Sequence, residues 1–259
     1  MSDPRQRVFI TGASSGIGEA LARHYAESGA VLGLVARKAE RLETFVASLP
    51  GEGHMALAAD VADVPAMQAA AEAFIARHGL PDIVIANAGI SVGILTEYAE
   101  DFEVFEKVLR TNVLGLFGTF HPFIARMRER RQGTLVGIAS VAGVRGLPGG
   151  SAYSASKAAA RRYLESLRVE MRASGVKVVT IAPGYIRTPL TAVNPYGMPF
   201  LLEADEAARR FARAIAKGTS YCVIPWQMGF VARLLAIAPN WLFDRAFAKA
   251  KHKPRKLPT

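Results

Sequence analysis

Short runs of apolar residues alternate along the chain with longer runs in which apolar and polar residues repeat at helical spacing. A continuous apolar run of a few residues, rich in valine and isoleucine, is typical of a strand buried on both faces. Apolar residues three and four positions apart are typical of an amphipathic helix. The alternation therefore predicts an α/β fold, a parallel sheet with helices on both faces. The predicted strands are residues 7–11, 31–35, 54–59, 82–86, 134–139, 176–181 and 221–224, and the predicted helices are residues 17–28, 39–49, 65–78, 102–131, 152–174 and 205–217.

The C-terminal part of the chain departs from this alternation. Residues 188–202 predict a long loop, and residues 226–259 predict two broken helices with a basic end. The apolar stretch of this last segment is barely long enough to span a bilayer and contains Arg233 and Pro239, so a transmembrane helix is not expected. No repeat or linker precedes it. We expect one domain over residues 1–225 and a helical basic extension over residues 226–259.

Composition narrows the classes of protein and partner. With 259 residues, 51% of them hydrophobic, the chain can bury the core of one large domain. The net charge of +10 is spread over several helices without interleaved stacking aromatics, so no nucleic-acid partner is expected. The single cysteine, Cys222, excludes an intrachain disulfide and fits a reducing compartment. No apolar stretch precedes the first strand, and we expect a cytoplasmic protein.

The first predicted strand runs into a glycine-rich turn, "TGASSGIG" at residues 11–18. Gly12, Gly16 and Gly18 would permit a tight turn and a close approach of the backbone to a ligand. The helix that follows offers free N–H groups to a pyrophosphate. The spacing differs from the common G-x-G-x-x-G fingerprint, and a flexible turn is the alternative. Its position at the first strand–helix junction favours dinucleotide binding.

Other predicted strands also end in residues that suit a ligand. Asp60 ends the third strand, "NAG" at residues 87–89 ends the fourth, Ser140 ends the fifth, and "PGYIRT" at residues 183–188 ends the sixth. Each alone could be turn chemistry. Because ligands bind at the carboxyl ends of strands in open parallel sheets, their recurrence favours one shared site.

Tyr153 and Lys157 lie four residues apart in a helix-forming run, so they share one helix face. A cation in that position stabilises a phenolate, which suits proton exchange with an alcohol or a carbonyl group. The spacing arises often by chance on solvated helix faces.

Taken together with Asn112, these motifs resemble the short-chain dehydrogenase/reductase family over residues 8–188. The resemblance implies a Rossmann-like, doubly wound parallel sheet of about seven strands, a nicotinamide cofactor and no metal. It implies a catalytic set of Asn112, Ser140, Tyr153 and Lys157. The residues expected at the cofactor are Gly12, Ser14, Ser15, Gly16, Ile17, Gly18, Arg37, Lys38, Asp60, Val61, Asn87, Ala88, Gly89, Tyr153, Lys157, Pro183, Gly184, Ile186 and Thr188.

The implied roles of the catalytic set follow from its chemistry. Ser140 would donate a hydrogen bond to the substrate oxygen, and Tyr153 would give that oxygen a proton or take one from it. Lys157 would favour the tyrosinate and hold the ribose hydroxyls. By analogy, Asn112 would hold a water molecule that links Lys157 to solvent.

The end of the second strand bears on the choice of cofactor. A carboxylate there usually binds the ribose hydroxyls of NAD, whereas an arginine accommodates a 2′-phosphate. The chain has Ala36 where the acid would stand, followed by Arg37 and Lys38. This pattern favours NADP(H), leaves NAD(H) open, and suggests carbonyl reduction as the working direction.

The substrate is expected to be a small carbonyl compound or alcohol that contacts residues 91–98, 142–150 and 188–202. The last segment is apolar and aromatic, which suits a lid over a hydrophobic or lipid-like substrate, although it could simply pack on the core.

Three further expectations concern the oligomeric state, the C-terminal extension and an alternative function. The runs 112–131 and 153–172 resemble the interface helices of the family, which implies a homodimer or homotetramer. The extension could contact a membrane surface peripherally, close the substrate site or pack against a second subunit. The alternative function is a dinucleotide-binding regulator or scaffold without turnover.

Overall fold

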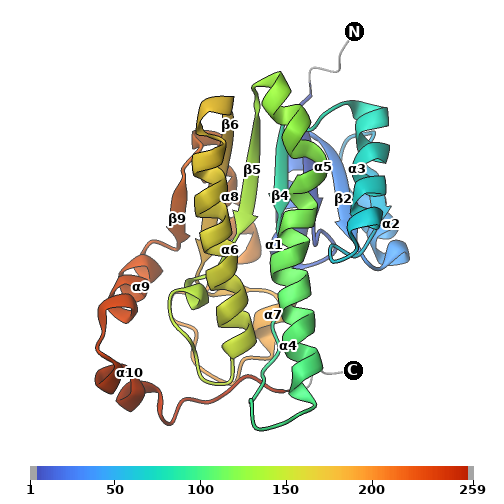
Figure 1. Ribbon diagram of the computed structural model, residues 1–259. Coiled ribbons are helices and arrows are strands. Elements are labelled where there is room, and N and C mark those ends of the chain that lie inside the picture. The colour runs from blue at the N-terminus through green and yellow to red at the C-terminus, as the bar shows by residue number, and fades with distance from the viewer. Residues whose placement is uncertain (1–4, 256–259) are drawn as a thin grey trace.

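The computed structural model describes residues 5–255 of the chain. Residues 256–259, the final part of the predicted basic extension, lie outside the described residues. The centre of the molecule is a seven-stranded sheet in the order β3-β2-β1-β4-β5-β6-β9 (Figure 1). Every neighbouring pair in it is parallel. The strands are β1 (Arg7–Thr11), β2 (Val31–Ala36), β3 (Met55–Ala58), β4 (Ile83–Ala86), β5 (Gly133–Ile138), β6 (Val176–Pro183) and β9 (Tyr221–Ile224).

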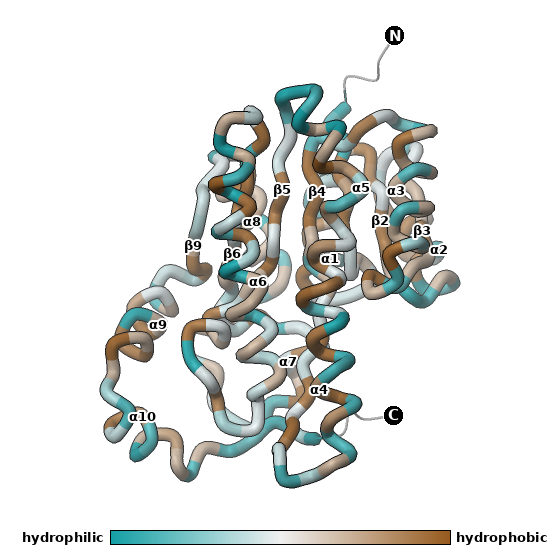
Figure 2. The backbone as a smooth tube through the Cα atoms, viewed as in Figure 1, coloured by the Kyte–Doolittle hydropathy of each residue, from teal (hydrophilic) through white to brown (hydrophobic). Residues whose placement is uncertain are grey.

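Helices cover both faces of the sheet, as the alternating pattern predicts. One core cluster joins the sheet to α1 (Gly16–Glu27), α2 (Ala39–Ala47) and α8 (Ala204–Lys217). The other joins the opposite face to α3 (Val64–His78), α5 (Gly115–Arg130) and α6 (Ser151–Glu170). Figure 2 shows hydrophobic residues along the strands between these two layers. The prediction of a Rossmann-like doubly wound sheet is confirmed.

The strand order reverses next to β1. β1 pairs with β2 on one side and with β4 on the other, so the connections leave in opposite directions from this point. Parallel sheets bind ligands in the crevice at such a reversal, beyond the carboxyl ends of the strands. The topology therefore sets one location for a site before any side chain is considered.

The predicted single helix 102–131 is interrupted. The structure has α4 (Asp101–Leu109), a five-residue π-helix η1 (Arg110–Leu114) and then α5. Asn112 lies in the π-helix, buried, with its side-chain amide bonded to the backbone of Ile90 on a different segment. The residues of a π-helical turn are of the same types as those of an α-helix. The pattern of apolar residues therefore does not reveal the interruption.

The segment predicted as a long loop carries short elements. β7 (Ile186–Arg187) pairs with β8 (Leu202–Glu203), and α7 (Pro189–Ala192) lies between them, begun by a capping box at Thr188. Three-residue 3₁₀ helices follow β5, as η2 (Val141–Gly143), and α6, as η3 (Arg172–Ser174). The extension forms α9 (Gln227–Ile237) and α10 (Asn240–Phe247).

Within residues 5–255, none of the helices combines the length with the hydropathy that a bilayer crossing requires.

Candidate active site

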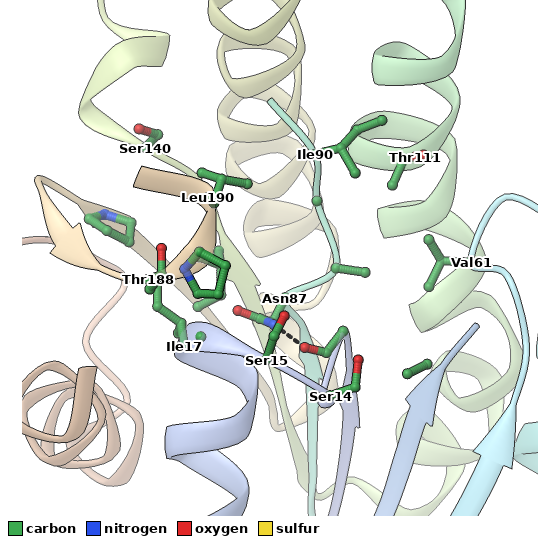
Figure 3. A pocket seen from close by; sticks show the side chains of 18 of the residues that line it. Ser14, Ser15, Ile17, Val61, Asn87, Ile90, Thr111, Ser140, Thr188 and Leu190 are labelled. Atoms are coloured by element: carbon green, nitrogen blue, oxygen red, sulfur yellow. Dashed lines mark hydrogen bonds between the residues drawn. The ribbon is translucent and has the colours of Figure 1, made fainter. Parts of the chain in front are cut away.

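A cavity of about 260 Å³ opens at the carboxyl ends of the strands, where the strand order reverses (Figure 3). It is lined by all of the residues predicted at the cofactor or the reaction except Gly18, Lys38 and Asn112. Its lining also includes Ala36, which stands where a carboxylate would discriminate between the cofactors, and Pro189, Leu190 and Thr191 of the segment 188–202 expected at the substrate. Six further lining residues were not predicted: Val35, Ala59, Ile90, Thr111, Ile138 and Ala139. Most of these are direct chain neighbours of predicted residues, so extending each motif by a residue or two would have found them.

The glycine turn between β1 and α1 forms one end of the cavity. Gly12 and Gly16 have φ values of 67° and 59°, which side chains rarely tolerate. A Cβ at Gly12 would lie 2.7 Å from the Ala88 Cα atom, so the turn can approach β4 only as glycine. A Cβ at Gly18 would collide with the Gly12 carbonyl oxygen, so Gly18 allows α1 to pack against the turn although it does not line the cavity.

Ser15 is the N-cap of α1, and its hydroxyl makes no capping hydrogen bond to the helix. The first N–H groups of α1 also lack partners within the helix, as at any helix N-terminus. Figure 3 shows Ser14 and Ser15 at the cavity beside Asn87. This end of the cavity therefore offers backbone and hydroxyl donors at the positive end of a helix, the environment that a phosphate requires.

Asn87 holds the glycine turn in place. Its side-chain amide donates to the carbonyl oxygens of Thr11 at 3.0 Å and Gly12 at 3.2 Å. The Thr11 hydroxyl in turn accepts the backbone N–H of Asn87 at 3.2 Å. The ends of β1 and β4 are thus joined by side chains, which fixes the shape of the turn.

Tyr153 and Lys157 lie on α6 and face the cavity together. The Lys157 Nζ atom lies 5.8 Å from the centroid of the Tyr153 ring and donates to the Ile138 carbonyl oxygen at 2.7 Å. Lys157 is 5% exposed, and its burial lowers its pKa to about 8. Burial also raises the pKa of Tyr153, which a hydrogen bond with Ser140 partly opposes. The phenol is therefore protonated at neutral pH and lies near a cation.

Ser140 follows β5 and is nearly buried. Its Oγ atom accepts the Ala142 N–H at 3.1 Å as the cap of η2, and its hydroxyl interacts with Tyr153. Because the cap bond occupies a lone pair, the Ser140 proton stays available for another acceptor. Two hydroxyl groups thus meet in the cavity from different elements.

Asn112 stands behind these groups. Its Oδ1 atom accepts the Ile90 N–H at 2.8 Å, and its Nδ2 atom donates to the Ile90 carbonyl oxygen at 3.0 Å and to Ser156 Oγ at 2.9 Å. Ser156 lies on α6 one position before Lys157. The Asn112 amide therefore joins the segment after β4 to α6. The water molecule expected at Asn112 stays a prediction.

The far end of the cavity passes the carboxyl end of β2. Ala36 ends this strand without a carboxylate, and the exposed Arg37 next to it lines the cavity. Lys38 begins α2 as its N-cap and is exposed. Across from them, Asp60 accepts the Ala62 N–H at 3.0 Å and also lines the cavity.

Within residues 5–255, no cluster of three or more His, Cys, Asp or Glu side chains is arranged to hold a metal ion.

Known sequences resemble this chain over nearly its whole length. The short chain dehydrogenase family matches residues 6–196. An uncharacterized oxidoreductase of Myxococcus xanthus is 37% identical over 240 residues, which cover 92% of this chain and 94% of that protein. The dehydrogenase/reductase SDR family member 7B of Mus musculus is 32% identical and covers 96% of this chain and 82% of its own. Sulfoacetaldehyde reductase of Chromohalobacter salexigens is 32% identical, with coverages of 92% and 91%.

Solved structures agree with these sequences. Levodione reductase superposes with a TM-score of 0.77 at 29% identity over 86% of this chain and 97% of its own. The 3-ketoacyl-(acyl-carrier-protein) reductase from Brucella melitensis, complexed with NADH, gives a TM-score of 0.76 at 26% identity over 85% of this chain and 96% of its own. These proteins belong to a family whose typical cofactor is a nicotinamide dinucleotide. On its sequence and its fold, the chain belongs to the short-chain dehydrogenase/reductase family of oxidoreductases.

Proposed function

We propose that this protein is an NADP(H)-dependent oxidoreductase that interconverts a carbonyl compound and a secondary alcohol. The observation that carries the proposal is the meeting of Tyr153, Ser140 and Lys157 in one cavity with the glycine turn at its other end. A nicotinamide dinucleotide, when bound, supplies or accepts the hydride. The chain supplies the positions and the proton.

Tyr153 is the acid and base of the reaction. Its raised pKa keeps the phenol protonated near neutral pH, so it can give a proton to a carbonyl oxygen during reduction. Ser140 donates a hydrogen bond to the same oxygen and fixes its distance from the phenol. As the proton leaves, the Lys157 ammonium stabilises the developing phenolate at a site from which water is largely excluded.

The residues of the glycine turn fit the pyrophosphate of the cofactor. The turn offers the N-terminus of α1 and the Ser15 hydroxyl, and glycine at positions 12 and 16 lets it pack closely against Ala88 and Thr188. Asn87 and Asn112 are positioning residues, because their amides are bonded to the turn and to the segment after β4. The Lys157 ammonium, which faces the cavity, would hold the ribose hydroxyls.

Ala36 and Arg37 support NADP(H) over NAD(H). β2 ends in Ala36 and not in a carboxylate that would repel a 2′-phosphate, and the Arg37 guanidinium at the cavity can bind one. The test is kcat/KM for NADPH against NADH. A preference of about tenfold or more for NADPH is expected, and a clear preference for NADH would overturn the choice.

The substrate we propose is a hydrophobic carbonyl compound. Ile90 and Leu190 line the cavity, with Leu190 on the side of Ser140 and Ile90 beside Thr111 (Figure 3). Ile94 is buried in a small apolar cluster with Ala152 of α6. The experiment is a panel of carbonyl compounds, apolar and charged, with consumption of NADPH followed by absorbance. Turnover of apolar members supports the proposal, and binding of NADPH without turnover of any member would favour the regulator or scaffold instead.

A homodimer or homotetramer is the assembly we propose. Leu114 at the end of η1 and Phe117 at the start of α5 are 56% and 48% exposed, and Val169 on α6 is 61% exposed. These apolar side chains lie on the two long helices expected at the interface of the family. A monomer by light scattering would contradict the proposal.

The extension is proposed to contact an anionic membrane surface from the cytoplasm. Trp226, Phe230, Leu234 and Ile237 follow one another at helical spacing along α9 and are 63%, 57%, 66% and 77% exposed. Trp241 on the next helix, α10, is 70% exposed. Figure 2 shows hydrophobic residues on α9, at the outer side of the molecule. Basic residues accompany them at Arg233, Lys249 and Lys251. Aromatic rings with flanking cations are typical of the bilayer interface.

Cosedimentation with vesicles tests this contact. The wild-type protein should pellet with vesicles rich in phosphatidylserine and remain in solution with neutral ones. The double variant Trp226→Ser, Trp241→Ser should lose pelleting. Equal pelleting of both proteins would refute membrane contact through this surface, and a change of oligomeric state in the variant would assign the surface to a second copy of the chain.

A further inference from the structure

The last described residues return from α10 to the substrate side of the cavity. Figure 1 shows this segment passing below α7 and reaching the start of α4. Residues 252–255 are here named the C-terminal strap. The Gly93 N–H donates to the Pro254 carbonyl oxygen at 2.9 Å, and a Cβ at Gly93 would collide with the Lys253 carbonyl group. The strap therefore packs directly against residues 91–98, with glycine making room for it.

The strap also touches the other two segments expected at the substrate. A Cβ at Gly149 would lie 2.7 Å from the Cβ atom of His252, so the strap lies close against residues 142–150. The Lys253 Nζ atom donates to the Leu190 carbonyl oxygen at 2.8 Å, and Leu190 lines the cavity. One short segment thus connects all three substrate segments.

Arg255 fastens the strap to the body of the protein. Its guanidinium donates to both carboxylate oxygens of Asp101, at 2.8 Å and 3.1 Å, and to Glu100 at 2.9 Å. The same group lies 3.5 Å from the centroid of the Tyr98 ring. An arginine that makes a bidentate contact with a carboxylate and also stacks on an aromatic ring is held in one geometry more firmly than an arginine in a single ion pair.

Asp101 makes this fastening more than a surface contact. Its side chain is 7% exposed, and the oxygen that accepts from Arg255 Nε also accepts the Leu95 N–H at 2.8 Å. One carboxylate therefore holds the strap, the segment 91–98 and the start of α4 together. Without Arg255, this carboxylate would lose its charge partner in a largely covered position, which is unfavourable.

The two helices of the extension are held at their junction by Arg145. This residue of the segment 142–150 donates to the Leu235 carbonyl oxygen at 2.9 Å and to Asn240 at 2.7 Å, and it lies 4.2 Å from the centroid of the Phe243 ring. The extension is thus attached at the junction of its helices and at the strap to segments expected at the substrate or next to them.

We infer that the C-terminal strap is a wall of the substrate site and that Arg255 is a positioning residue for substrate binding. The inference rests on the proposed carbonyl reduction. Fastened to Asp101, the strap holds residues 91–98 and Leu190 at a fixed separation, which limits the size of the carbonyl compound that enters. Unfastened, the site is wider and binds a small substrate less tightly, while the cofactor end is unaffected.

Arg255→Ala tests the inference, with Arg245→Ala as the matched control, since Arg245 is an exposed arginine of the same extension. Arg255→Ala should raise KM for the carbonyl substrate about tenfold with kcat within about threefold, the pattern of lost ground-state binding. The Kd of NADPH should not change. Asp101→Asn should act in the same direction, and combining it with Arg255→Ala should add little, because both changes release one contact.

A second measurement is independent of turnover. The Gly93 amide, which donates to Pro254, should exchange its hydrogen faster in Arg255→Ala than in the wild-type protein or in Arg245→Ala. Unchanged KM and unchanged Gly93 exchange in folded Arg255→Ala would overturn the inference. If that variant does not fold, Arg255→Lys, which keeps the charge but loses the bidentate geometry, must show an intermediate KM. A wild-type protein without carbonyl turnover would refute the proposed function instead, and Gly93 exchange would still decide whether Arg255 fastens the strap.

Discussion

The cofactor end and the substrate end of the cavity are built in different ways. The cofactor end consists of turns that follow directly from strands, such as the glycine turn after β1 and the segment after β4. The substrate end is assembled from three loops and a strap whose contacts join residues far apart in the chain, as between Arg255 and Asp101, 154 positions apart. One end is therefore encoded locally, and the other depends on tertiary contacts.

This difference has a consequence for substitution. A change at the cofactor end meets backbone that the sheet fixes in place, so its effect is steric and large. A change at the strap releases a contact between the strap and the loops of the substrate end. Its effect is therefore on substrate affinity and selectivity. Tyr153 and Ser140 stand where the two ends meet, and their replacement should affect the chemistry itself.

The largest effect is expected at the junction. Tyr153→Phe removes the proton donor while retaining the ring, so kcat for carbonyl reduction should fall by about a thousandfold or more. The Kd of NADPH, measured by fluorescence titration, should stay within about twofold of the wild-type value, because the phenol is not needed for the phosphate contacts. Full activity of this variant would remove Tyr153 from the mechanism.

A large effect is also expected within the cofactor end. Gly12→Ala places a Cβ 2.7 Å from the Ala88 Cα atom in a left-handed conformation. It should lower the free energy of unfolding by about 2 kcal/mol and weaken NADPH binding. The control is Gly229→Ala, whose Cβ would make an ordinary 3.6 Å contact with Val223. If both variants melt alike and bind NADPH alike, the close approach of the turn to β4 is not required.

A smaller effect separates the two cofactors. Arg37→Ala should lower kcat/KM for NADPH about tenfold and leave that for NADH nearly unchanged, because only NADPH has the 2′-phosphate that the guanidinium would bind. Lys38→Ala should have a weaker effect, since Lys38 does not line the cavity. Equal losses with both cofactors would show that Arg37 acts on the fold and not on the phosphate.

The smallest effect is the response to pH. Burial lowers the pKa of Lys157 to about 8, so the free enzyme loses this cation as pH rises through that value, and kcat/KM for NADPH should fall above it. The lowered pKa also affects stability. Between about pH 8 and 10.5, Lys157 is protonated in the unfolded chain but has lost its proton in the folded protein, so the free energy of unfolding rises with pH over this range. A profile that stays level to about pH 10 would show that Lys157 keeps its charge.

The sequence predicts the cofactor end better than the substrate end, for the same physical reason. Strand runs and the glycine turn are local, so periodicity and motif spacing indicate the sheet, its two layers of helices and the residues at the strand ends. Gly18 and Lys38 belong to the same motifs but do not line the cavity, because a motif does not show which of its residues reach the ligand.

The rest depends on contacts that no local pattern contains. The π-helix around Asn112 is stabilised by contacts with Ile90 and Ser156, which belong to other segments. The local pattern of residues 102–131 does not contain these contacts and predicts one continuous helix. The short helix after Thr188 is irregular in composition and depends on its capping box. The position of the strap follows from Arg255 and Asp101, two ordinary charged residues until the fold brings them together.

The most direct test of the central claim is the transfer of label from NADPH to product. With NADPH carrying deuterium at the reactive carbon of the nicotinamide ring, the account predicts deuterium on the carbinol carbon of the alcohol, from one face only, in the wild-type protein and none in Tyr153→Phe. Tight binding of NADPH with no label in any product of the carbonyl panel would contradict it.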